Sequence, residues 1–240
     1  MKYEGENMRK NFKSTYGNTL KVLFYMANPI KKKVKRTDCI VHKFINLEAL
    51  DILKNDGYEK EYNFFKKYTS SLNKGVVWAD SDFKSTNHFY HHEEGGGLYG
   101  FSDASTECLR YYNTAICFAK NKEYDKSLFF LGAACHLVQD ATVPAHAKKK
   151  LINHKGFESF VVREVISGYN HEIKRGMIKF NKPEEFISEN TKYAVFIESK
   201  FRNLKNKEER FSKITDKVLL RANQTTAGFL LLYYNNIQNL

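Results

Sequence analysis

The most constraining feature of this chain is the stretch HLVQDATVPAHAKKKLINHKGFE, residues 136–158, which carries two pairs of metal-binding side chains. His136 pairs with Asp140, His154 pairs with Glu158, and His146 lies between the pairs. Residues four apart share one face of an α-helix, one turn above the other. Each pair can bind one cation from a single helix, so the pattern predicts two helices that meet at a metal site. Imidazole and carboxylate ligands at this spacing suit zinc.

Each pair taken alone has a simpler interpretation, a solvated polar pair on a helix surface. The sequence around the first pair argues against it, because residues 131–135 are mostly apolar and Leu137 and Val138 continue the run. A histidine and an aspartate within a buried stripe need polar partners, and a metal ion is one such partner. Two pairs with a histidine between them favour a metal site over two unrelated surface pairs.

Helical patterning extends over most of the chain and predicts an all-α fold. The 240 residues suffice for one domain with a sizeable core, and 13 Gly with 3 Pro leave long segments without helix breakers. Apolar residues at helical spacing form a broad stripe at 38–55. The same spacing predicts helices at 58–72, 102–121, 124–140 and 154–168, and about three more within 171–240.

The expected organisation is a basic N-terminal extension at 1–36, with one short helix at 18–28, followed by an all-helical domain at 37–240. Residues 74–100 lose helical periodicity and are predicted to form a long loop, with 76–78 as the candidate for an extended piece. Long ordered loops in compact domains are often functional.

Three further candidates lie outside the 136–158 stretch. His42 falls in the first turn of the helix at 38–55, where a hydrogen-bonded core histidine is the alternative to a metal ligand. Asp80 and His88 lie in the predicted loop, where the alternative is a solvated position. His91 and His92 follow and are interpreted mainly as solvated loop residues.

The formal net charge of +12 favours an anionic partner, such as a phospholipid surface or nucleic acid, with a solvated Lys-rich surface as the alternative. The four cysteines lack C-x-x-C spacing, which gives no indication of a zinc knuckle or redox motif. The sequence contains no run of 18 apolar residues, so no membrane-spanning helix is predicted. The sequence also lacks G-x-S-x-G and H-E-x-x-H motifs.

Two segments, FFLGAACHLVQDATVPAHA and NHKGFESF, resemble the zinc-dependent phospholipase C family, of the bacterial phosphatidylcholine-hydrolysing and alpha-toxin type. That family has the pattern H-x3-D-x5-H followed by H-x3-E. The segment TDCIVHKFINLEALDILKND resembles its first ligand helix, and NHFY at 87–90 resembles its loop histidine motif. The resemblance runs in order from about residue 37 to 165.

The resemblance implies an all-α domain with two or three zinc ions and phospholipase C activity on phospholipid headgroups. One zinc would be bound by His88, His136 and Asp140, and a second by His146, His154 and Glu158. His42 would bind the third, and Asp80, with Asp82 as the neighbouring alternative, would bridge the first and third and activate the attacking water. The expected partner is a phospholipid substrate or an anionic membrane surface.

The chain departs from the family pattern at several positions. No Trp precedes His42, although the family uses an N-terminal Trp as a ligand of the third zinc, and the family's Asp-Pro is here His91-His92. Ser81 and Ser85 stand where aromatic residues hold choline in characterised members, which argues against a phosphatidylcholine preference.

Two other functions stay open at this point. One is a single-strand-specific zinc nuclease, and the other is a degenerate zinc-binding protein that binds a lipid or a partner. Family members are typically secreted, whereas the apolar stretch at 20–27 is interrupted by Lys21 and lacks a secretory cleavage pattern. A cytoplasmic or membrane-peripheral location therefore stays open, and the sequence gives no indication of an oligomeric state.

Overall fold

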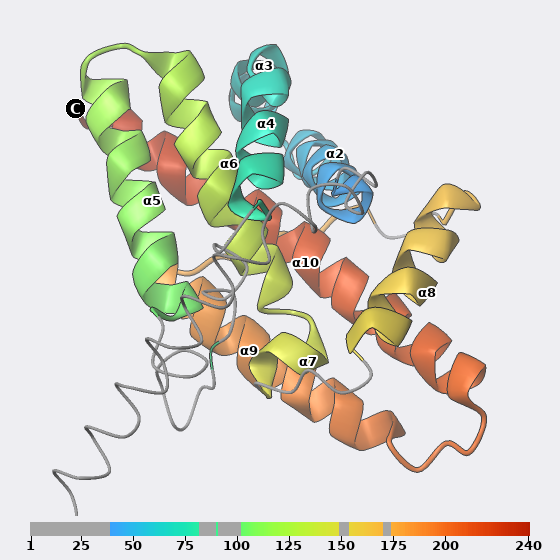
Figure 1. Cartoon of the computed structure of the whole chain (residues 1–240). Helices are drawn as coiled ribbons and strands as arrows, with labels where there is room; N and C mark the ends of the chain where they lie inside the picture. The colour runs from blue at the N-terminus through green and yellow to red at the C-terminus, as the bar shows by residue number, and fades with distance from the viewer. Residues whose placement is uncertain (1–38, 82–89, 91–101, 149–153, 170–173) are drawn as a thin grey trace, which may run out of the picture.

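The structure is a computed structural model that describes residues 39–81, 90, 102–148, 154–169 and 174–240. Every regular element within these residues is a helix, which confirms the all-α prediction (Figure 1). In the described ranges, none of the helices combines the length and the apolar content that crossing a membrane requires. The helices are α2 (Ile40–Asn55), α3 (Glu59–Lys67), α4 (Thr69–Ala79), α5 (Ala104–Lys120), α6 (Tyr124–Asp140), α7 (Pro144–Ala147), α8 (His154–Ile166), α9 (Pro183–Phe201) and α10 (Lys207–Gln238).

The helix α6 is the central element of the domain. Every residue from Leu131 to Asp140 is buried, whereas a helix on the surface would expose one face. The helices α4 and α5 pack along α6, and α2, α9 and α10 contact its remaining sides (Figure 1). Polar side chains in the last two turns of α6 are therefore held inside the protein, where they need polar partners.

Two glycines allow α4 and α6 to approach each other at backbone contact. A Cβ atom on Gly75 of α4 would lie 1.8 Å from the carbonyl oxygen of Phe129, and one on Gly132 of α6 would lie 2.0 Å from that of Leu72. No side chain fits at either position without displacing a backbone. The rings of Tyr68 and Tyr124, at the starts of the two helices, lie with centroids 5.9 Å apart, so α4 and α6 begin together and run in the same direction.

The buried apolar residues form two clusters. The main cluster joins α2, α3, α4, α5, α6, α9 and the second half of α10. The second cluster joins the start of α2, α8, the end of α9 and the first half of α10. The three helices α2, α9 and α10 contribute to both clusters, whereas α6 belongs to the main cluster and α8 to the second.

The structure corrects several expected boundaries. The predicted helix at 58–72 is two helices, because Tyr68 breaks the run and the hydroxyl of Thr69 donates to the carbonyls of Phe65 and Lys66. The helix α4 then continues to Ala79, so the predicted start of the loop at residue 74 and the extended piece at 76–78 are wrong. Close packing of Gly75 against α6 outweighs the low helix propensity of this segment.

Further differences concern the second half of the chain and the terminus. The loop predicted between α6 and α8 contains the short helix α7. Within residues 174–240, two helices stand in place of the expected three. The predicted helix at 18–28 lies outside the described residues, as does the whole of 1–38. The division into an extension at 1–36 and a domain at 37–240 stays a prediction.

Candidate metal centre

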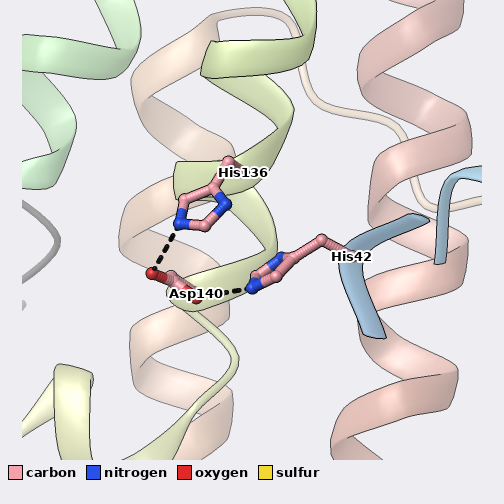
Figure 2. A group of neighbouring side chains, drawn as sticks. All are labelled: His42, His136 and Asp140. Atoms are coloured by element: carbon pink, nitrogen blue, oxygen red, sulfur yellow. Dashed lines mark ion pairs between the residues drawn. The ribbon is translucent and has the colours of Figure 1, made fainter. Parts of the chain in front are cut away.

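Three side chains come together where the first turn of α2 meets the last turns of α6 (Figure 2). His136 Nε2 lies 3.2 Å from Asp140 Oδ2, and His42 Nε2 lies 3.4 Å from Asp140 Oδ1. The rings of His42 and His136 stack with centroids 4.1 Å apart. One ligand atom from each of the three residues lies within 4.8 Å of the other two, so a single cation can contact all three.

His146 joins this group from α7. Its Nδ1 lies 3.3 Å from Asp140 Oδ2, and its Nε2 lies 3.9 Å from Glu158 Oε1 on α8. Pro144 occupies the first turn of α7, where its fixed φ suits a helix start, and the short helix places His146 in a buried position. The imidazole of His146 therefore stands between the carboxylates of α6 and α8.

The nitrogen–oxygen distances around Asp140 are those of neighbouring zinc ligands. Ligands about 2.0–2.1 Å from a tetrahedral zinc lie roughly 3.3 Å from one another. The three imidazole nitrogens lie 3.2, 3.3 and 3.4 Å from Asp140 oxygens, longer than a typical charge-assisted hydrogen bond of about 2.7–2.9 Å. Nitrogen and oxygen donors also match the preference of zinc. The residues present therefore fit this metal.

The electrostatics of the group favour a cation. Burial alone raises the pKa of the Asp140 carboxyl, but the imidazoles of His146 and His136 outweigh burial and hold that pKa well below its usual value. Asp140 is 4% exposed, so its negative charge is screened little by water. An ionised carboxylate surrounded by imidazoles, with solvent largely excluded, is the arrangement that a divalent ion stabilises.

Gln139 also belongs to this region, although it was not predicted from the sequence as a site residue. Its side-chain Oε1 lies 2.8 Å from His42 Nδ1, and its Nε2 donates to Asn46 Oδ1 at 2.9 Å. Gln139 is 1% exposed. The available signal was an amide within an apolar run, one residue before a predicted ligand, because a buried amide needs partners.

Asp80 lies at the C-terminal end of α4. Because α4 and α6 begin together, the 11 residues of α4 bring Asp80 to about the level at which α6 presents His136. The thiol of Cys39, which directly precedes α2, donates to Asp80 Oδ2 at 3.3 Å. Cys39 is three residues before His42, so Asp80 lies near the start of α2. Its bridging and catalytic roles stay predictions.

The remaining predicted ligands are only partly described. His88 and the alternative Asp82 lie outside the described residues, together with Ser85, His91 and His92. His154 begins α8, and its side chain lies outside the described part of the structure. The resemblance grouped His42 with Asp80 in a third site, whereas the geometry places His42 directly beside His136 and Asp140. Which residues share one ion stays a prediction.

Comparison with known proteins places these observations in a family. The sequence model of the family described as zinc dependent phospholipase C matches residues 41–221, a range that contains every predicted ligand. A phospholipase C of Listeria monocytogenes is 25% identical over 226 residues, which cover 81% of this chain and 76% of that protein.

Solved structures share the fold. Alpha toxin from Clostridium absonum superposes with a TM-score of 0.71 at 15% identity, and covers 83% of this chain. Alpha-toxin of Clostridium perfringens, from an avian strain, superposes with a TM-score of 0.70 at 18% identity, again over 83% of this chain. This chain spans 64% of the length of each toxin chain. At these identities the likeness establishes the fold alone.

Proposed function

Because the chain belongs to the zinc dependent phospholipase C family, we propose that it is a zinc-dependent phosphodiester hydrolase that cleaves phospholipids into diacylglycerol and a phosphorylated headgroup. The observation that carries the proposal is the convergence of His42, His136 and Asp140 on one point, within the matched range. His42 and Asp140 are 98 positions apart in sequence and lie on different helices, α2 and α6. A purely structural role requires no such concentration of imidazoles around one carboxylate.

The residues that would hold zinc form two adjacent groups. His42, His136 and Asp140 make up the first, and His146 and Glu158, with His154 as the predicted third ligand, make up the second. Bound zinc would supply positive charge to the phosphate oxygens and stabilise the charge that develops in the transition state. The His146 imidazole, 3.3 Å from Asp140 and 3.9 Å from Glu158, would set the spacing between the two groups.

We assign the proton transfer to Asp80. Its carboxylate would accept a proton from the water that attacks phosphorus, while the bond between phosphorus and the glycerol oxygen breaks and that oxygen receives a proton through water. The Cys39 thiol, which donates to Asp80 Oδ2 at 3.3 Å, would hold the carboxylate in a fixed orientation. The position of Asp80 at the end of α4, near the start of α2, supports this role.

The charge of the chain suggests how it would meet its substrate. A formal net charge of +12 attracts an anionic lipid surface, and each basic residue near such a surface contributes about 1 kcal/mol. The same charge would also attract nucleic acid, so a zinc nuclease is kept as an outcome of the test below. Family membership favours the phospholipid.

The test is to purify the chain, measure zinc per chain by elemental analysis, and follow diacylglycerol release from vesicles. Vesicles of phosphatidylcholine, with and without anionic lipid, and single-stranded DNA would be compared, each with and without a chelator. We expect at least one zinc per chain and chelator-sensitive diacylglycerol release that increases with anionic lipid. A folded protein with less than one zinc and no release from any phospholipid would overturn the proposal. Chelator-sensitive DNA cleavage without lipid cleavage would replace it with a nuclease.

A further inference from the structure

One buried amide, Gln139, contacts two residues of α2 at once. His42 and Asn46 are four apart, so they lie on one face of α2 in successive turns. Gln139 of α6 meets the first with its Oε1, 2.8 Å from His42 Nδ1, and the second with its Nε2, 2.9 Å from Asn46 Oδ1. Its Nε2 also lies 3.4 Å from the hydroxyl oxygen of Thr226 on α10. Both polar ends of the Gln139 side chain are thus occupied.

The contact continues beyond α2 as a chain of amides. Asn46 Nδ2 donates to Asn73 Oδ1 on α4 at 2.9 Å. Gln139 and Asn46 therefore each accept a hydrogen bond on the amide oxygen and donate one from the amide nitrogen, so the bonds run in one direction from His42 to Asn73. The opposite direction requires every amide in the chain to be reversed. Gln139 and Asn46 are almost fully buried, so water does not replace these bonds.

The direction of the amide chain determines which nitrogen of His42 carries its proton. When Gln139 Oε1 faces the ring, Nδ1 must be protonated and donates to it, which leaves the Nε2 lone pair on the side of Asp140. When every amide is reversed, Gln139 donates to Nδ1, and Nε2 carries the proton. Only the first arrangement leaves Nε2 able to bind a metal ion.

We propose that Gln139 is a positioning residue for the metal centre, which holds His42 in the Nδ1-protonated form and points its Nε2 at the cation that Asp140 and His136 bind. The inference rests on the proposed function only in requiring that the site binds zinc. Hydrogen bonds to the second nitrogen of a ligating histidine fix its ring orientation and increase its basicity, and their loss typically reduces metal affinity by about 10–100-fold.

A structural role for Gln139 predicts a different outcome. The amide joins α2, α6 and α10, and removing it leaves buried polar groups on Asn46 without a donor, which costs about 1–3 kcal/mol of stability. A variant that only loosens this junction would unfold more easily yet bind zinc as before. The two roles are separated by comparing substitutions that keep or remove the acceptor for His42.

The experiment compares Gln139→Met with Gln139→Glu in the full-length chain. Methionine has nearly the same length and cannot accept the bond from His42, whereas the carboxylate introduced by Gln139→Glu accepts it but cannot donate to Asn46. Zinc affinity is measured by competition with a chelator, in the absence of substrate. We expect Gln139→Met to lose about 10–100-fold in zinc affinity and Gln139→Glu to stay close to the parent protein, although both lose stability.

Thr226→Val is the matched control. It removes the longer contact of the Gln139 amide and leaves the bond to His42 in place. Zinc affinity in this variant should equal that of the parent chain. Equal zinc affinity in folded Gln139→Met and the parent chain would overturn the inference, as would an equal loss of zinc affinity in all three variants.

A second measurement needs no substitution and covers the case in which Gln139→Met does not fold. Nitrogen-15 spectra of the histidine side chains in the zinc-loaded parent chain distinguish a protonated ring nitrogen from a metal-bound one. We expect His42 to show a protonated Nδ1 with slow hydrogen exchange and a metal-bound Nε2. A proton on Nε2 overturns the inference. Because both measurements are made without substrate, a chain that binds zinc but cleaves no lipid would contradict the proposed function alone.

Discussion

The two apolar clusters differ in how tightly they are closed. In the main cluster, Leu53, Leu72 and Leu131 are fully buried, and α4 and α6 touch through their backbones. In the second cluster, Phe157 and Val161 of α8 keep exposures of 8% and 6%. The candidate metal centre lies between them, with His136 and Asp140 on a helix of the main cluster and Glu158 on α8 of the second. On the proposed metal site, we expect α8 to gain stability from metal binding through Glu158, and the main cluster to depend mainly on its own packing.

The largest effect should come from removing the negative charge of Asp140, which lies at the metal centre between the two clusters. Asp140→Asn keeps the shape of the side chain and removes the anion that lies beside His42, His136 and His146. We expect roughly a 1,000-fold lower rate of diacylglycerol release, equivalent to about 4 kcal/mol, because metal binding supplies several kcal/mol of transition-state stabilisation. Initial rates at saturating zinc measure this, with circular dichroism to check folding. A loss of less than tenfold would mean that Asp140 is not a ligand.

A pair of glycines compares the close contact of α4 and α6 with the exposed surface of α8. Gly132→Ala would force a Cβ to within 2.0 Å of the Leu72 carbonyl oxygen, so we expect a loss of about 3 kcal/mol in the free energy of unfolding. Gly156→Ala on α8 would meet only Lys207 Nζ at 3.8 Å, and alanine has the higher helix propensity, so a gain of up to about 1 kcal/mol is expected. Denaturant unfolding of both variants measures the contrast. No loss of stability in Gly132→Ala would contradict the backbone contact between α4 and α6.

Removal of zinc should affect the two clusters unequally. At free zinc 100-fold above the dissociation constant, a bound ion adds about 2.7 kcal/mol of stability. We expect a chelator to lower the melting temperature by an amount of that order and to increase amide hydrogen exchange in α8 more than in α5. Hydrogen-exchange mass spectrometry with and without chelator measures this. Equal increases in both helices would contradict a role of the metal in holding α8.

Trimming the second cluster itself should cost less stability than any of the losses above. Val161→Ala removes two buried carbon atoms and should cost about 1.5 kcal/mol of unfolding free energy. Leu131→Ala, in the main cluster, should cost more, about 2–5 kcal/mol, because the fully buried site cannot collapse around the lost volume. Thermal unfolding of the two variants side by side ranks them. The reverse order would mean that the second cluster is the more tightly packed one.

The parts of this fold that local sequence determines were predictable. The helix at 124–140 has the bounds that its apolar spacing predicted, and α8 begins at residue 154 as predicted. The spacing of His136 and Asp140 places both on one face of α6, and the structure brings their side chains within 3.2 Å. These features depend on helical periodicity over one or two turns, which can be read without knowing what packs against the helix.

The features that depend on contacts between distant segments were not predictable. Read locally, Gly75 predicts a break in the helix. The helix α4 nevertheless continues through it, because the backbone of α6 lies where a side chain at position 75 would be. The contact of His42 with Gln139 joins positions 97 apart, and no spacing rule predicts it. Family resemblance supplied His42, Asp80 and His88 as ligands, and their assignment to particular ions stays a prediction.

The glycine contact between α4 and α6 also bears on turnover. Gly132 lies one turn before His136 on α6, and Gly75 lies five residues before Asp80 on α4. Widening the distance between the two helix axes would move the Asp80 carboxylate away from the candidate metal centre by a similar amount, because a short helix moves as a rigid rod. On the proposed assignment of Asp80, two residues that have no side chain and touch no reacting atom help to determine how fast the enzyme works.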